Sequence, residues 1–267
     1  MSTDFPYERY ITLAEPQAQA RRAVYYPAGE EELARWVVQK IDRAAQELSR
    51  LLERPCPEMD ILLVAPADWE LAPHEDPEEI SASQPYWTDA TSPPSLVVPV
   101  EVEAIFGEVT QEKLAFFLYH ELALAFLEDD PRPWPEDIPL WADEWQLKFA
   151  ALWLTHTLDG QQDVVSKDLF EQYTDIFEPE PDGKTPVTVR GFDWFEDTTL
   201  EEYLVYELLL ERFAAELLAH YEPATLPRFL KHYRVERDTL LSDEVTAILA
   251  RSLGPGAANW LESLVYF

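Results

Sequence analysis

Two carboxylates and one imidazole lie in apolar segments where they could take part in hydrolytic chemistry. His120 and Glu121 are adjacent in "FFLYHELALAFL", and Glu144 lies in a second apolar segment, "IPLWADEWQLKFAAL". An imidazole can hold a divalent metal, and a nearby carboxylate can take a proton from a metal-bound water. Two histidines that share one metal on a helix stand four residues apart, but the residue four positions after His120 is Leu124. Leucine cannot coordinate a metal, so these residues alone leave the chemistry open.

The segments that would position these residues are short strands and long helices. Runs rich in β-branched and aromatic residues predict strands at 22–27, 60–66 and 95–100. Apolar periodicity predicts helices at 29–55, 110–127, 140–158 and 198–220, with shorter ones at 226–233, 243–253 and 257–266. The segment 140–158 is apolar nearly all round, which is typical of a buried helix. The pattern indicates an α+β protein.

Two segments have no long periodic run. The Pro- and acid-rich residues 67–94 are predicted to form a surface loop, and residues 160–197 an insertion or loop with one hairpin around "VTVRGF". Thr198, followed three residues later by Glu201, predicts a capping box at the start of the next helix.

The length of 267 residues favours one domain with two lobes. We expect a single domain over 1–267, with an N-terminal α/β lobe at 20–135 and a helical C-terminal lobe at 136–267.

Charge is the strongest compositional signal. The formal net charge is −32, and residues 55–189 hold 29 acidic against five basic side chains. Such a chain repels phosphate backbones and anionic lipids, so we expect no nucleic acid or membrane partner and favour a protein with a basic surface. The commoner meaning of an acidic surface, solubility alone, stays open. A single cysteine, Cys56, and the lack of a signal-like or membrane-spanning apolar run predict a cytoplasmic protein.

The order of these segments resembles that of the zincin metallopeptidases, in particular the gluzincin branch, or peptidase MA-like group. "AVYYPAGEEELARWVVQKIDRAAQELSRLL" resembles the family's opening strand and helix, and "FLYHELALAFL" its His-Glu-x-x-His helix. "IPLWADEWQLKFAAL" resembles the helix that brings in the third zinc ligand, and "LARSLGPGAANWLESL" is similar to the closing segment. The resemblance implies a zincin-like α+β fold with a small N-terminal sheet, long helices and a mostly helical C-terminal lobe.

Transferred residue by residue, the resemblance implies that His120 is the first zinc ligand, Glu121 the general base and Glu144 the third ligand. Leu124 occupies the second-ligand position, and Trp145 stands where the family often has glycine, which would crowd a substrate. The motif is therefore degenerate, and we expect no cofactor. A buried Glu144 carboxylate needs a partner, which predicts a pair with His120 where the family has its metal.

Three functions stay open. The first is a catalytically inactive metallopeptidase-like protein, a pseudopeptidase that acts as a binding or scaffolding module. The alternative is a zinc-dependent hydrolase that uses His120 and Glu144 with an unidentified third ligand. The third, an acidic mimic of nucleic acid, rests on charge alone. On residue types alone, His120 is also typical of a hydrogen-bonded residue of a helical core.

Overall fold

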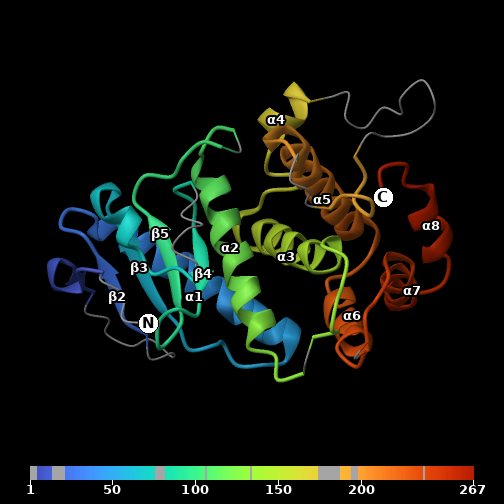
Figure 1. The fold of residues 1–267 in the computed structure, drawn as a ribbon, viewed down its shortest axis with the longest axis horizontal. Coiled ribbons are helices and arrows are strands. Elements are labelled where there is room, and N and C mark those ends of the chain that lie inside the picture. Colours follow the sequence, from blue (N-terminus) through green and yellow to red (C-terminus); the bar gives the residue numbers. More distant parts are fainter. Residues whose placement is uncertain are drawn as a thin grey trace. The chain divides into compact units, whose positions relative to one another are not determined.

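The computed structural model describes residues 5–13, 22–75, 82–105, 107–132, 134–173, 187–193, 198–236 and 238–267. The chain divides into two compact units, Met1–Asp129 and Asp130–Phe267. The first unit contains the sheet and two long helices, and the second is helical (Figure 1).

The first unit is built on a five-stranded mixed sheet with the order β1-β2-β3-β5-β4. The strands are β1 (Ile11–Thr12), β2 (Val24–Tyr26), β3 (Asp60–Val64), β4 (Tyr86–Thr88) and β5 (Ser95–Pro99). β2, β3 and β5 run parallel, while β1 and β4 are antiparallel edge strands. Every residue of β5, and every residue of β3 after Asp60, is buried, as the continuous apolar runs of these two segments predict. The predicted strands are confirmed in place.

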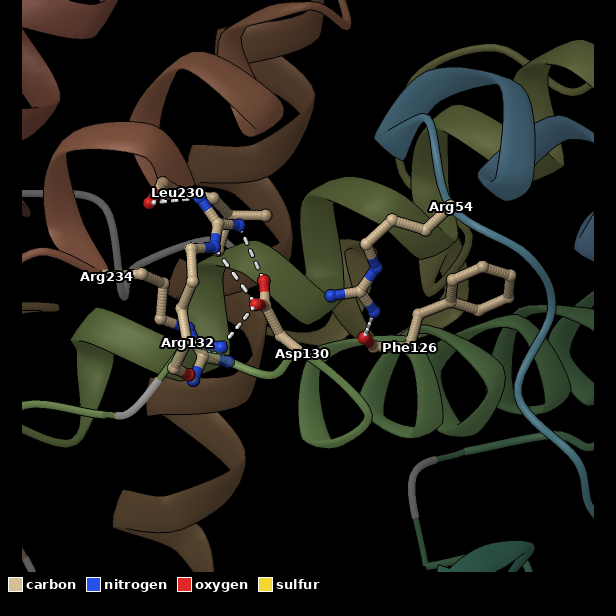
Figure 2. Close-up of polar contacts among 6 residues, drawn as sticks. All are labelled: Arg54, Phe126, Asp130, Arg132, Leu230 and Arg234. Atoms are coloured by element: carbon tan, nitrogen blue, oxygen red, sulfur yellow. Dashed lines mark hydrogen bonds and ion pairs between the residues drawn. The ribbon is translucent and has the colours of Figure 1, made fainter.

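Two helices accompany the sheet. In α1 (Glu31–Leu52), Glu31 and Glu32 lie at the positive end of the helix dipole, and one apolar face is buried. α2 (Gln111–Glu128) begins where the Thr110 side chain accepts a hydrogen bond from the backbone N–H of Lys113. Arg54, just after α1, donates to the carbonyl oxygen of Phe126 in α2 (Figure 2). This contact joins the ends of the two helices.

The segment predicted as one surface loop, 67–94, contains regular structure. A 3₁₀ helix, η2, covers Pro66–Leu71, and β4 pairs antiparallel with β5 in the register Trp87↔Leu96. β4 lies alongside α2 (Figure 1). The prediction of a loop throughout is therefore wrong, because a three-residue edge strand between Pro-rich turns is too short to give a periodic signal.

The second unit is a set of helices. They are α3 (Trp141–Leu154), the π-helix η4 (Thr155–Asp159), α4 (Lys167–Gln172), α5 (Leu200–His220), α6 (Thr225–Tyr233), α7 (Ser242–Leu253) and α8 (Ala257–Ser263). α3 packs mainly on α5, and its burial on most sides confirms the prediction from its apolar composition.

One local prediction for this unit is wrong, and the described residues test a second one only in part. The capping box is made by Thr199 and Glu202, one residue after the predicted pair Thr198 and Glu201. The doubled sequence Thr-Thr-Leu-Glu-Glu permits both registers. The expected hairpin around 187–192 is not formed by the described residues 187–193, which make a turn. The flanking residues 174–186 and 194–197 lie outside the described residues, so the hairpin stays a prediction.

A polar cluster secures the segment that leads into α3. Arg132 donates through Nε and Nη2 to the two carboxylate oxygens of Asp130, at 3.0 and 2.6 Å, and through Nη1 to the carbonyl of Leu230 in α6 (Figure 2). The buried Arg234 guanidinium lies on the Trp134 ring and donates to the carbonyl of Arg132. These contacts fix the start of the second unit to α6. Within the part of the chain that the structure describes, no helix is both long and apolar enough to cross a membrane.

Candidate functional site

The polar residues of α2 form a contact with each other. His120 Nδ1 and Glu121 Oε1 are 2.9 Å apart, and the two side chains are 17% and 14% exposed. Both side chains are therefore largely covered without being fully buried. The structure confirms that both residues lie on a helix, as the sequence predicts.

Glu121 has a second partner that the sequence does not indicate. Its Oε2 accepts a hydrogen bond of 2.9 Å from the backbone N–H of Trp87 in β4. Because β4 is an edge strand paired with β5 on one side only, the outward-facing N–H of Trp87 would otherwise need water. One oxygen of Glu121 thus bonds the sheet edge and the other bonds His120.

Leu124 lies one turn after His120 on the same side of α2 and is half-buried. No described group of three or more His, Cys, Asp or Glu side chains is arranged to hold a metal ion. A catalytic tetrahedral zinc site needs three protein ligands, and Leu124, at the spacing of a second histidine after His120, offers no donor atom. The residues present do not fit the zinc that the fold would imply.

Glu144, the predicted third-ligand position, belongs to α3 in the second unit and lies beside a buried cation. Lys148, one turn later, forms an ion pair of 2.5 Å with Glu207 of α5, and the two side chains are 9% and 12% exposed. Burial alone would lower the pKa of Lys148, but Glu207, with Glu144 and Glu211, raises it above its ordinary value. Lys148 thus supplies positive charge near Glu144. The predicted pairing of Glu144 with His120 stays a prediction.

Asp143 and Trp145 flank Glu144 but face other surroundings. Asp143 accepts hydrogen bonds of 3.2 Å from Gln146 Nε2 and from the hydroxyl of Tyr233 in α6. The Trp145 indole is fully buried and meets Phe229 edge-on, with ring centroids 4.9 Å apart. Its position in the helical core agrees with the packing role that is usual for buried tryptophan.

Comparison with known proteins supports the fold. Yeast LTA4 hydrolase has a similar structure, with a TM-score of 0.51 and 12% sequence identity. The match covers 95% of this chain and 38% of the hydrolase chain, so this chain spans well under half of that protein. No family model and no curated protein sequence matches. The chain has a zincin-like α+β fold.

Two contacts near the predicted site residues were not predicted. The bond from Trp87 to Glu121 joins residues 34 positions apart, and its donor is a backbone group, so no residue type could reveal it. Lys148 was visible as a charged residue in an apolar helix, four positions after Glu144. A carboxylate and a lysine at that spacing are neighbours on a helix, which is the signal that could have found it.

Proposed function

We propose that this chain is a metallopeptidase-like protein without peptidase activity that acts as a binding or scaffolding module. The observation that carries the proposal is the position of Glu121. A general base must reach the water that it deprotonates, whereas the two oxygens of this carboxylate are directed to the backbone N–H of Trp87 and to His120 within the first unit. Glu121 therefore acts as a structural link between α2 and the edge strand β4.

The two predicted ligand positions that follow His120 support the same function. Leu124 offers no donor atom where a second imidazole is needed, and Glu144 lies beside the cation Lys148. A lysine ammonium offsets the charge of a nearby carboxylate without any metal. The similarity to yeast LTA4 hydrolase concerns the fold, and a fold does not fix an activity.

The test is a metal analysis and an activity assay on protein purified without chelator and without a metal-affinity tag. We expect far less than one zinc per chain and no cleavage of a mixed peptide library. The opposite result is one tightly bound zinc per chain that is lost in Glu144→Ala. That result would overturn the proposal and establish the zinc-dependent hydrolase instead.

A further inference from the structure

The first unit contains a cavity of about 1160 Å³ whose lining does not include His120 or Glu121, although its Trp87 bonds Glu121. Its walls are the residues before β2, the segment before β3, β4 with the turn that follows it, and the end of α2. All of these belong to the first unit. The volume slightly exceeds the range of about 300–1,000 Å³ that is usual for ligand sites in proteins, and it is far larger than a single ion requires.

Carboxylates dominate the polar wall. Five acidic residues line the cavity: Glu58, Asp60, Asp89, Glu128 and Asp129. The one basic residue in the wall, Arg22, is already paired through Nη2 with Asp42 at 3.2 Å. The wall therefore carries a large excess of negative charge, and a concave surface concentrates such a field. A cationic occupant is favoured.

Arg22 adds an observation that charge does not explain. Its side chain is 3% exposed, yet Nε and Nη1 have no hydrogen-bond acceptor among the described residues. A buried guanidinium donor that has no acceptor destabilises the folded chain. Because Arg22 lines the cavity, an occupant with a neutral oxygen acceptor, such as a peptide carbonyl, would satisfy it.

The remaining wall is apolar and partly aromatic. This part of the wall contains one tryptophan and three prolines: Trp87, Pro57, Pro93 and Pro94. The aliphatic stems of lysine and arginine pack on such surfaces, and an indole attracts their charged heads. A wall with proline, tryptophan and carboxylates thus suits a long cationic side chain better than a compact ion. Among the described residues, no three of these carboxylates are placed so that they could hold one metal ion together.

We propose that this cavity binds a basic peptide segment of a partner protein. Lysine or arginine side chains of the segment lie among the five carboxylates, and one backbone carbonyl of the segment accepts from Arg22. The inference rests on the proposed binding role of the chain and names the class of partner. It does not depend on whether α2 holds a metal.

The test uses the full chain and a fluorescent peptide in which arginine and alanine alternate, with a citrulline–alanine peptide of equal length as the uncharged control. Binding is measured by fluorescence anisotropy at low salt and at about 0.15 M salt. Two variants with the same change of charge are compared. Glu58→Gln with Asp89→Asn alters the cavity wall, whereas Glu70→Gln with Glu103→Gln alters exposed residues of the same unit outside it.

We expect the native chain to bind the arginine peptide, and the cavity variant to bind it about tenfold more weakly. The matched control variant should lose less than about threefold. Thermal unfolding confirms that both variants are folded.

Equal losses in the two variants would overturn the proposal, because they would reflect the general field of the protein. The proposal would also be overturned if the native chain did not bind the peptide, or if equimolar spermidine or Mg²⁺ displaced the peptide. Zinc content measured on the same samples separates the two proposals. If the protein holds zinc and binds the peptide through the cavity, only the proposed lack of peptidase chemistry is contradicted. If the protein is free of zinc and does not bind the peptide, only the proposed peptide site in the cavity is contradicted.

Discussion

Helices α2 and α3 each carry one of the predicted acidic site residues, and they hold it in different ways. On α2, Glu121 bonds a backbone N–H of β4 and the neighbouring His120. On α3, Glu144 lies near Lys148, a buried cation whose ion pair with Glu207 joins α3 to α5. The partner of Glu121 on β4 is a backbone N–H, so this contact depends on the position of the edge strand. The cation beside Glu144 is the Lys148 side chain, so that contact depends on one residue. Single substitutions should therefore affect the two helices unequally.

The largest effect is expected from Lys148→Met. Removing the ammonium leaves Glu207, Glu144 and Glu211 at a helix interface without their cation. Breaking a buried ion pair by deleting one partner costs about 3–5 kcal/mol in free energy of unfolding. Denaturant unfolding of the native chain and the variant measures this loss.

The exposed Lys167→Met in α4 is the matched control, and we expect a change below about 0.5 kcal/mol. The double variant Lys148→Met with Glu207→Leu should recover part of the lost stability, because it removes the carboxylate that lost its partner. A loss below about 1 kcal/mol in the single variant would contradict the role given to Lys148.

A smaller effect is expected on α2 from Glu121→Ala. The variant leaves the N–H of Trp87 without its acceptor at the sheet edge. The expected loss is about 1–3 kcal/mol in free energy of unfolding. Glu121→Gln keeps an oxygen acceptor and should lose less than about 1 kcal/mol, as should Glu112→Gln in the exposed first turn of α2. Equal losses for the alanine and glutamine variants would show that the bond to Trp87 is not the stabilising contact.

The smallest effect concerns alkaline pH and a second polar contact of the first unit. The Tyr10 hydroxyl donates to Asp68 and accepts from the backbone N–H of Ala65, and burial raises the pKa of Tyr10 to about 12. Its contribution is fully present below pH 10, the pKa of unfolded tyrosine, and is lost as the pH rises toward 12. Tyr10→Phe should therefore show a shallower fall in stability over this range than the native chain. An unchanged slope would contradict this.

The sequence predicted the elements better than the contacts between them. Strands and helices with a clear apolar pattern were predicted correctly, because such a pattern depends on local sequence and burial. They are β3, β5, α1 and α3. β4 was missed because three residues between turns have no period.

The contacts of the site residues were harder to predict. The Trp87–Glu121 bond forms only after the sheet and α2 have come together, so no local pattern encodes it. The start of α5 was placed one residue early because Thr198 and Thr199 are equally good capping residues by type.

The central claim is that α2 resembles a metallopeptidase helix but lacks the metal site. The most direct test is a titration of zinc into the native chain and into a Leu124→His, Ala123→Gly variant. Position 124 lies one turn after His120, so the new imidazole completes the two-histidine spacing of a zinc-binding helix. Glu112→His, at the exposed start of α2, adds a histidine without that spacing. Calorimetry should detect zinc binding in the Leu124→His variant, and little in the native chain or in Glu112→His. Tight zinc binding by the native chain, or none by a folded Leu124→His variant, would contradict the account.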